Sequence, residues 1–473
     1  MPARGAERLY RGSIGAGHIV FFVVAAAAPL TSVVGASPPA FAFGNGAGVP
    51  CVFALAGVLY LLFSVGFTAM SPYIRATGGF YAYVARGLGR PAGIGGAMIA
   101  ISTYTAIELA VLSLAGVFLE AMLKPLGLPW WGYTAGVMAL VVIAGRREVS
   151  FSGVLLGICM IAEVAILLLL DLAILARGGG PQGVSLTSFA PGVVLAPGLG
   201  VAIVFVVGSF MGFEATALFA EECERPERTI PRATFAAVLI IAVFYAFTTW
   251  AITQFYGPAN VKVAANAGLD TFYFAAADKV LGPWASRLMR LLLIVSLFAS
   301  CLSLHSAVNR YLFALGREGV LPRALARLHP TYGSPYVAGL AQAISALALI
   351  AVFAIARLDP YAIVFAWTSA FAVIGVLTVQ VLVCFAMIRF FKANPGAAGP
   401  WAGVVAPILS AAGLAATLYL VIANLPLMAG STSPVLRSFP YVIVAIGLAG
   451  AGFALWLRRA RPALYAALDH VFE

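Results

Sequence analysis

Residues 23–46 read VVAAAAPLTSVVGASPPAFAFGNG, and residues 201–222 read VAIVFVVGSFMGFEATALFAEE. Both stretches are apolar enough for a membrane helix, yet both contain residues that a continuous helix tolerates poorly. Pro29 lacks a backbone donor and clashes with the preceding turn, and Gly208 and Gly212 loosen the second stretch. We therefore predict interrupted helices in the first and the sixth apolar segment of the chain.

The composition around these stretches predicts a membrane protein. Of the 473 residues, 62% are hydrophobic and only 10% are charged, whereas a soluble domain carries about 25% charged residues. A chain in lipid must satisfy its backbone internally, as a helix bundle or a closed barrel. The apolar runs are continuous over about 20 residues, which favours helices, and they lack the alternation of a barrel strand.

Twelve apolar segments predict an all-α polytopic protein with about 12 transmembrane helices. Eleven spans follow the first, so we expect the first to be retained rather than cleaved as a signal peptide. We also expect short helices in the loops 71–90, 318–329 and 258–283, in the last near 269–281. The predicted spans are 17–44, 50–70, 93–119, 130–145, 151–175, 199–220, 233–257, 285–313, 335–356, 360–389, 402–425 and 437–457.

The distribution of basic residues predicts the orientation. With the N-terminus in the cytoplasm, 20 of the 28 Lys and Arg residues fall on the cytoplasmic side and 8 fall outside. This bias follows the positive-inside rule and places both termini in the cytoplasm, with the chain in the cytoplasmic (inner) membrane. It also accounts for the net positive charge, so we expect no nucleic-acid partner.

The reactive side chains do not form an enzyme-like or metal-binding pattern. The sequence contains no phosphate loop, no GxSxG, no HExxH and no CxxC pair. We therefore predict no catalytic residues, no metal and no cofactor, and we do not expect an enzyme or an ATP-driven pump. The scattered residues are Cys51, Cys159, Cys223, Cys301, Cys384, His18, His305, His329 and His470.

The two interrupted segments occupy corresponding places in two halves of five helices. Transporters with inverted repeats place their substrates and ions at such interruptions. Unpaired N–H groups at a half-helix terminus suit a carboxylate, and unwound carbonyls suit an ammonium group or a cation. An amino acid zwitterion fits both, so we predict bare amides facing a common pocket. The alternative is that these Pro and Gly residues are ordinary helix kinks.

Four regions resemble a known family. Residues 211–233, MGFEATALFAEECERPERTIPRA, resemble the GFE…AEE…NP.R.IPRA signature of the amino acid–polyamine–organocation permeases. Residues 71–89 and 309–335 resemble two further loops of that family, in the same order, and the Glu-bearing fifth segment resembles a bacterial subset. PLTSVVG at 29–35 stands at about the place of the family's usual GSGIF-like break.

The resemblance implies a 5+5 inverted repeat of the leucine-transporter type with two appended helices. It also implies that substrate binds between helices 1, 3, 6, 8 and 10. The corresponding division of the chain is a cytoplasmic segment 1–16, helices 1–5 in 17–175, an external loop 176–198, helices 6–10 in 199–390, helices 11–12 in 391–458 and a cytoplasmic tail 459–473.

The substrate-binding candidates come from the interruptions and from the third helix. Tyr104 and Glu108 share one helix face, so Glu108 attracts an ammonium group if that face lines the pocket and otherwise pairs with a polar group in the bundle. Phe210 is either an aromatic gate or plain packing. The full set is Thr31, Ser32, Val33, Gly35, Tyr104, Glu108, Gly208, Ser209, Phe210 and Gly212.

Acidic residues in membrane spans are costly and are candidates for function. Burial of Glu163 lets it take up and release a proton, although a permanently structural carboxyl is the alternative. The resemblance suggests that Glu214 bridges helices or senses protonation, again with a structural hydrogen bond as the alternative. Asp171 lies near the outer end of its span, where we expect it to be solvated.

Hydroxyl groups on the eighth helix are candidates for a cation site. Ser296, Ser300 and Ser303 follow a spacing of four and three residues and share a face. Ser300 and Ser303 are the cation-site candidates, by analogy with sodium-coupled relatives of the fold. Serine in membrane helices also bonds across helices or to its own backbone, so both readings stay open.

The sequence thus predicts a secondary active transporter of amino acids that works by alternating access, with proton-coupled symport. The alternatives are an exchanger or importer of organic amines or polyamines and, in another class, a channel or transporter-like sensor. The expected partners are the small-molecule substrate, a proton or a sodium ion, and the lipid bilayer.

Overall fold

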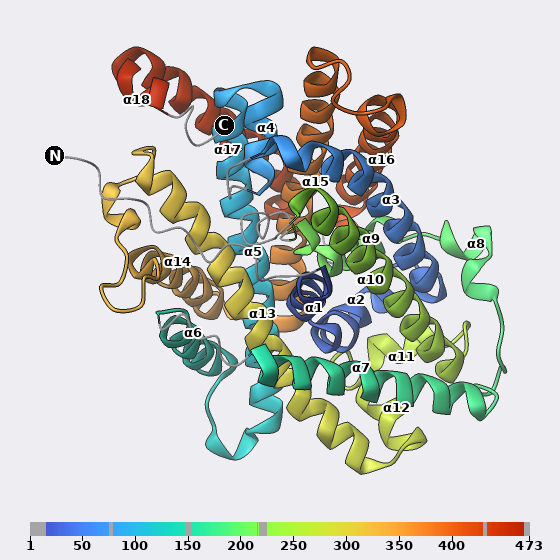
Figure 1. Ribbon diagram of the computed structural model, residues 1–473. Coiled ribbons are helices and arrows are strands. Elements are labelled where there is room, and N and C mark those ends of the chain that lie inside the picture. Colours follow the sequence, from blue (N-terminus) through green and yellow to red (C-terminus); the bar gives the residue numbers. More distant parts are fainter. Residues whose placement is uncertain are drawn as a thin grey trace.

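The computed structural model describes residues 16–74, 79–146, 153–214, 216, 225–428 and 433–467. Across these ranges every regular element is a helix and none is a strand (Figure 1). Nine helices in the described residues are long and apolar enough to cross a membrane. The chain is therefore a multi-pass membrane protein. These nine spans contain α3 (Val49–Met70), α5 (Arg90–Met122), α7 (Gly153–Ala176), α10 (Pro226–Tyr256), α13 (Pro283–Arg317), α14 (Tyr336–Ile355), α15 (Ala366–Ala393), α16 (Ala406–Met428) and α17 (Pro434–Ala460).

The other three predicted spans coincide with helices that are shorter or interrupted. Span 130–145 is the single helix α6 (Trp130–Arg146). Span 17–44 is divided into α1 (Ala16–Ala27), the π-helix η1 (Thr31–Ala36) and α2 (Ser37–Ala42). Span 199–220 begins with α9 (Leu199–Phe210).

The first interruption lies at Ala28, immediately before Pro29. Ala28 has a φ of 45°, in the left-handed region that an L-residue enters only at a cost. The following proline disfavours right-handed helical geometry for the residue before it. The chain then continues as the wider turns of η1, and Pro38 and Pro39 begin α2.

The second interruption lies just after α9. Met211 is extended, with φ −60° and ψ 134°, and Gly212 has a φ of 108°. Glycine adopts that conformation without strain, and residues with a side chain rarely do. The predicted interruptions are therefore present at residues 28 and 211–212. The predicted remainder of the sixth segment, residues 217–220, lies outside the described part of the chain.

The predicted loop helices are present in two of three places. Loop 71–90 contains α4 (Phe80–Leu88), and loop 258–283 contains α11 (Val261–Ala267) and α12 (Phe272–Val280). Loop 318–329 contains only a single 3₁₀ turn, η7 (Arg323–Ala326). The remaining short elements are η2 (Gly46–Gly48), η3 (Ser71–Tyr73), η4 (Lys124–Leu126), η5 (Thr187–Phe189), α8 (Pro191–Val194), η8 (Pro360–Phe365), η9 (Trp401–Val405) and α18 (Pro462–Ala467).

The long helix α5 is the centre of the bundle. It packs against α4, α6, α13, α15 and α17, and two-thirds of its most apolar stretch is buried by protein rather than facing outward. The helix α5 also approaches α17 closely. A β-carbon added to Gly95 would lie only 2.7 Å from the Gly447 carbonyl oxygen. Small residues allow such backbone contact between membrane helices.

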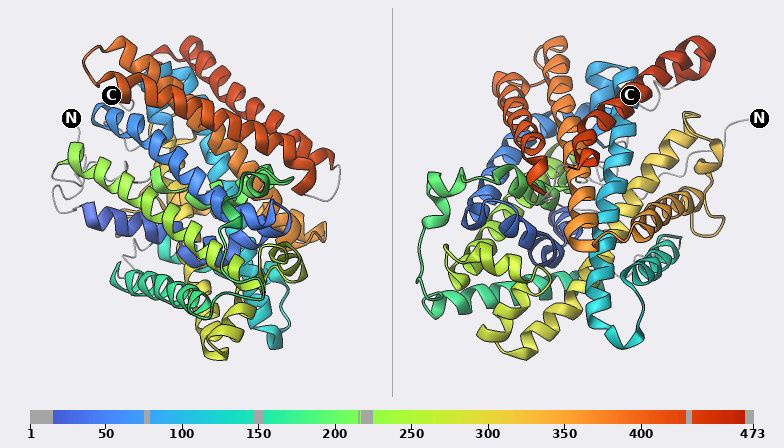
Figure 2. Two further views of the ribbon diagram at one scale, coloured as in Figure 1. Left: turned by 90° about the vertical axis from the view of Figure 1, so that its right-hand side faces the viewer. Right: turned by 180° about the vertical axis from the view of Figure 1, so that it is seen from behind.

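The loops gather at the two ends of the bundle. Figures 1 and 2 show α12 and the α5–α6 connection at one end, and α4 and α18 at the opposite end. At the first end, Lys262 donates to the Gly44 carbonyl at 2.8 Å and Asn266 to the Ala42 carbonyl at 3.0 Å. These bonds fasten α11 to the last turn of the interrupted first segment.

One carboxylate next to a membrane span predicts a pH-dependent stability. Glu318 directly follows α13 and is buried, and its oxygens accept no hydrogen bond from the described residues. Burial raises the pKa of Glu318 to about 7, and the nearby charge of Arg317 opposes this only in part. Because the folded protein favours the protonated form, its stability falls as pH rises from about 4.5 to about 7. We expect Glu318→Gln to remove this fall and to raise the unfolding temperature by about 2 °C at pH 8.

Thermal unfolding of the two purified proteins across this pH range measures the effect. At low pH the acid and the amide are both neutral, so the difference between the variant and wild type is expected to shrink there. A difference that is the same at every pH would show that Glu318 does not titrate in the folded protein.

Candidate functional site

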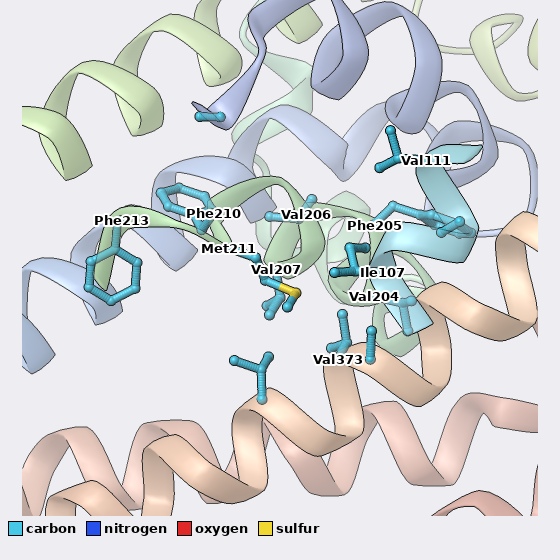
Figure 3. Packing of buried hydrophobic residues seen from close by; sticks show 14 of the residues in the cluster. Ile107, Val111, Val204, Phe205, Val206, Val207, Phe210, Met211, Phe213 and Val373 are labelled. Carbon is cyan, nitrogen blue, oxygen red and sulfur yellow. The ribbon is translucent and has the colours of Figure 1, made fainter. Parts of the chain in front are cut away.

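A cavity lies where both interrupted segments meet three long helices. Its walls come from α1 and η1, α5, α9, α13, and the junction of η8 with α15. These are the spans that the resemblance numbers 1, 3, 6, 8 and 10. Figure 3 shows its apolar wall, with Ile107, Val204 and Phe205 close together. The lining residues are Ala27, Thr31, Ser32, Ala36, Ile107, Val111, Leu114, Val204, Phe205, Gly208, Ser209, Met211, Ser300, Leu304, Phe365 and Ser369.

The cavity is apolar with a few hydroxyl groups. Thr31, Ser32, Ser209, Ser300 and Ser369 contribute hydroxyls, and the described lining contains no acidic or basic side chain. The Ser32 hydroxyl donates to the Ala27 carbonyl at 2.7 Å, across the first interruption. The Ser369 hydroxyl is buried and has no hydrogen-bond partner among the described residues. It can therefore bind a polar group of a ligand without breaking a bond in the protein.

The prediction that the interruptions leave bare amides is wrong at three residues. The Leu30 N–H donates to Glu163 Oε2 at 3.2 Å, and the Thr31 N–H lies 3.4 Å from Ser296 Oγ. At the second interruption, the Gly212 N–H donates to Glu214 Oε2 at 3.0 Å. Side chains bind these freed donors because an unpaired N–H inside a membrane is costly.

Glu163 connects α7 to the first interruption. It is 4% exposed, and besides the Leu30 amide it accepts a hydrogen bond from the Ser296 hydroxyl at 2.9 Å. The Thr31 hydroxyl donates in turn to Ser296 at 3.1 Å. Because Thr31 lines the cavity, two hydroxyl groups join the cavity wall to the Glu163 carboxyl.

Glu214 performs a similar role after the second interruption. Its Oε1 accepts a hydrogen bond from the Tyr104 hydroxyl on α5, and its Oε2 accepts the Gly212 amide. The Tyr104 ring also packs against Tyr311, with ring centres 5.8 Å apart. Tyr104 and Glu214 therefore link α5 to the second interruption beside the cavity, and neither lines it.

Glu108 does not line the cavity. It is fully buried and contacts His305 on α13 and Gln342 on α14. The structure therefore agrees with the second predicted alternative, in which Glu108 pairs with a polar group within the bundle. Its neighbours along α5, Ile107 and Val111, face the cavity instead.

The remaining sequence candidates divide between the lining and the surrounding core. Gly208, Ser209 and Ser300 line the cavity with Thr31 and Ser32. Phe210 is packed against Tyr60, with ring centres 5.1 Å apart, and has no exposed surface. The candidates that do not line the cavity are Val33, Gly35, Tyr104, Glu108, Glu163, Phe210, Gly212, Glu214 and Ser303.

One further sequence prediction concerns Asp171. Asp171 is only 1% exposed, so the expectation that it is solvated is wrong. Packing of α10 and α12 around α7 covers this outer part of the helix. Among the described residues, no three His, Cys, Asp or Glu side chains are grouped closely enough to hold a metal ion.

The geometry brings further residues to the site that the sequence analysis gave no role there. Ser296 joins Thr31 to Glu163, and Phe365 and Ser369 line the cavity. Ser296 could have been found from the sequence, because its spacing places it on the same helix face as Ser300. The resemblance implied that helix 10 takes part in binding, but it gave no means of choosing Phe365 or Ser369 on that helix.

Comparison with known proteins agrees with this geometry. The sequence profile described as "amino acid permease" matches residues 19–449. An uncharacterized transporter of Mycobacterium tuberculosis is 26% identical over 228 residues, which are 46% of this chain and 49% of the relative. The low-affinity putrescine importer PlaP of Escherichia coli is 22% identical over 292 residues, 61% of this chain and 63% of the importer. The branched-chain amino acid permease BcaP of Bacillus subtilis is 24% identical over 137 residues, 29% of this chain and 28% of that protein.

The matched parts span about half to two-thirds of the first two relatives and less of the third. The family profile covers almost the whole chain and includes both interrupted segments and the cavity. This confirms the resemblance to the amino acid–polyamine–organocation permeases. The chain therefore belongs to the amino acid permease family, whose members are transporters rather than enzymes.

Proposed function

We propose that the protein is a secondary active transporter that carries neutral amino acids across the cytoplasmic membrane by alternating access. The observation that carries this proposal is the cavity at the meeting point of both interrupted segments with α5, α13 and α15. The helices are not continuous there, so small rotations of the chain on either side of Ala28 and Gly212 open one face of the cavity and close the other.

The cavity favours a zwitterion with an apolar side chain. Serine and threonine hydroxyls suit the carboxylate, as donors, and the ammonium group, as acceptors. Ile107, Val111 and Phe205 provide an apolar surface for the side chain. A diamine such as putrescine has two cationic ends, and the described lining offers no carboxylate to either of them. We therefore place the polyamine alternative second, although one relative is a putrescine importer.

The proposed architecture is the 5+5 inverted repeat with two appended helices, twelve spans in all. It rests on the family membership and on the positions of the interruptions in the first and sixth segments. We propose the domain boundaries given above and cytoplasmic termini. The loops assigned to the outside, such as 258–283, lie at one end of the bundle, and α4 and α18 lie at the other (Figure 2).

We further propose that transport is coupled to protons through Glu163. This carboxyl is buried beside the first interruption, and the Thr31–Ser296 hydroxyl pair joins it to the cavity. Glu214 is the second candidate, through Tyr104. The sodium alternative has less support. Of its two candidates, Ser300 lines the cavity and Ser303 does not, and the neighbouring Ser296 hydroxyl already donates to Glu163.

A ligand screen followed by transport tests the proposed function. We expect neutral amino acids with apolar side chains to raise the unfolding temperature of the purified protein more than putrescine does, since ligand binding stabilises by RT ln(1 + [L]/Kd). In proteoliposomes, the best ligand is expected to show saturable uptake that exceeds equilibration when the outside is acidic.

Empty liposomes and liposomes without a pH gradient are the controls. Flux that neither saturates nor concentrates the ligand would favour a channel. Binding without any flux would favour a transporter-like sensor. Stabilisation by putrescine alone would replace the amino acid proposal with the amine importer.

A further inference from the structure

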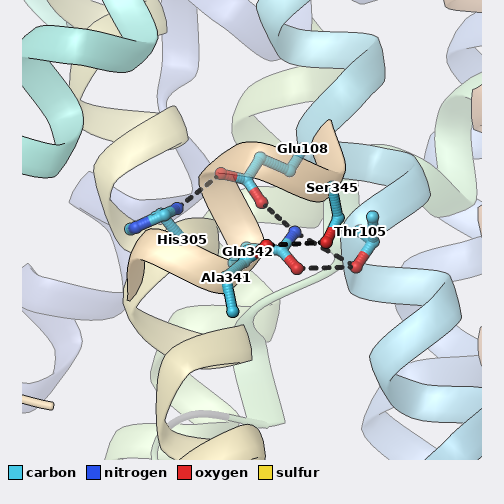
Figure 4. A network of polar contacts seen from close by, with 6 residues as sticks. All are labelled: Thr105, Glu108, His305, Ala341, Gln342 and Ser345. Carbon is cyan, nitrogen blue, oxygen red and sulfur yellow. Dashed lines mark hydrogen bonds and ion pairs between the residues drawn. The ribbon is translucent and has the colours of Figure 1, made fainter. Parts of the chain in front are cut away.

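A second group of buried polar side chains lies behind the cavity wall, between α5, α13 and α14 (Figure 4). Glu108 is 0% exposed and His305 is 1% exposed, and Glu108 Oε1 lies 2.9 Å from His305 Nδ1. Glu108 Oε2 accepts a hydrogen bond from the Gln342 amide at 2.7 Å, and that amide also donates to Thr105 at 3.1 Å. Both carboxylate oxygens are therefore bound by side chains from other helices.

The charge of this group depends on one nitrogen. The Gln342 amide donates to Glu108 Oε2. The other carboxylate oxygen, Oε1, is in short contact with His305 Nδ1, and a proton lies between these two atoms. With a second proton on His305 Nε2 the pair is neutral overall. Without it the pair carries one negative charge in an apolar interior, which is costly.

The surrounding elements supply little other charge. Among the described residues, Glu108 and His305 form the one direct contact between an acidic and a basic side chain. The Cys301 thiol on α13 also interacts electrostatically with Glu108. The helix α14 has no ionisable side chain beyond Tyr336 at its start, and α6 approaches His305 through Gly145, with Arg146 at its end.

A second polar side chain lies near the Nε2 edge of His305. A β-carbon built on Gly339 would lie 3.4 Å from His305 Nε2 and 3.0 Å from Asn309 Nδ2, so both side chains border Gly339. Asn309 is 7% exposed, and its Oδ1 has no hydrogen-bond partner among the described residues. It lies one turn further along α13 toward Arg317.

The pair is also connected to the cavity through its own helices. Ile107 and Leu304 line the cavity, and they directly precede Glu108 and His305 in the sequence. A movement of α5 relative to α13 that reshapes the cavity therefore changes the separation of Glu108 and His305. A wider separation removes the partner that stabilises a protonated imidazole.

We propose that Glu108 and His305 form a second proton-binding site, distinct from Glu163, at which a proton is bound and released through His305 Nε2 beside Asn309. The binding of the proton stands on the geometry of the pair. Its link to transport rests on the proposed function. The site holds its proton while α5 and α13 are close and releases it when they separate.

Thermal unfolding tests proton binding without any substrate. Glu108→Gln, His305→Gln and the control Thr105→Val are made in the Glu318→Gln background, so that the loop carboxyl does not contribute. We expect the unfolding temperature of the background protein to depend on pH, because loss of the Nε2 proton leaves a buried charge. Thr105→Val is expected to keep this pH dependence. The two variants of the pair are expected to lose the part that the pair contributes and to keep the part that is due to Glu163.

Transport tests the coupling. In proteoliposomes we expect Glu108→Gln and His305→Gln to lower pH-gradient-driven accumulation about tenfold, while exchange at equal pH stays within about threefold of wild type. Thr105→Val is expected to keep both the gradient-driven accumulation and the exchange at equal pH. If His305→Gln does not fold, Glu108→Gln and Glu108→Asp decide the question.

Two results would overturn the proposal. One is an unchanged pH profile of unfolding in both variants of the pair, and the other is wild-type accumulation by both. If wild type itself transports no amino acid or amine, the proposed function is wrong, and the unfolding profiles still decide whether the pair binds a proton.

Discussion

Glu163→Gln is expected to keep the fold and substrate exchange but to lower pH-gradient-driven accumulation about tenfold. The reason is that glutamine retains the oxygen that accepts hydrogen bonds from the Leu30 amide and the Ser296 hydroxyl. The helix interruption therefore stays supported, while the group that binds and releases a proton is gone. Uptake into proteoliposomes with an acidic outside, compared with exchange at equal pH, measures the two properties separately.

Asp171→Asn is the matched control for this experiment. Asp171 lies on the same helix and is also buried, but among the described residues it makes no hydrogen bond to the first interruption. We expect this variant to keep gradient-driven accumulation. Wild-type accumulation by Glu163→Gln would show that Glu163 is a structural acceptor and that the proton is carried elsewhere, with the Glu108–His305 pair as the next place to look.

The interruptions themselves could be predicted from the sequence because their causes are local. Pro29 acts on the residue before it and on its own turn, and Gly212 permits a conformation that other residues avoid. The partners of the freed amides could not be predicted in the same way. Leu30 and Glu163 are separated by 133 positions, and no feature of either segment encodes their contact.

The sequence also could not show which side of a helix faces the cavity. The spacing of Tyr104 and Glu108 placed both on one face of α5, and that much follows from helix geometry. The spacing does not say whether that face or the face of Ile107 and Val111 borders the cavity, since α5 is surrounded by protein on several sides. Of the residues named from the sequence, Thr31, Ser209 and Ser300 line the cavity and Glu108 does not. Their roles in binding stay predictions.

Gly208 lines the cavity. We therefore expect the size of the side chain at this position to decide transport. A β-carbon at Gly208 would meet no atom closer than Val373 Cγ2 at 3.9 Å and Ile107 Cδ1 at 4.0 Å. Alanine therefore fits without strain, and a helical Gly→Ala change even favours the helix by about 1 kcal/mol. Leucine at this position adds three further carbons that point into the cavity. We expect Gly208→Ala to transport within about threefold of wild type and Gly208→Leu to lose at least about a hundredfold, because the substrate's volume is then occupied.

The comparison depends on showing that the leucine variant is folded. Its unfolding temperature and its elution profile in detergent are expected to match those of Gly208→Ala, because the added carbons enter empty space rather than a packed contact. Gly136→Leu provides the same chemical change on the exposed face of α6, where no atom lies within 4 Å of the added β-carbon. Transport is expected to be normal in that control. A Gly208→Leu protein that is folded and carries substrate at the wild-type rate would place the path of the solute outside this cavity.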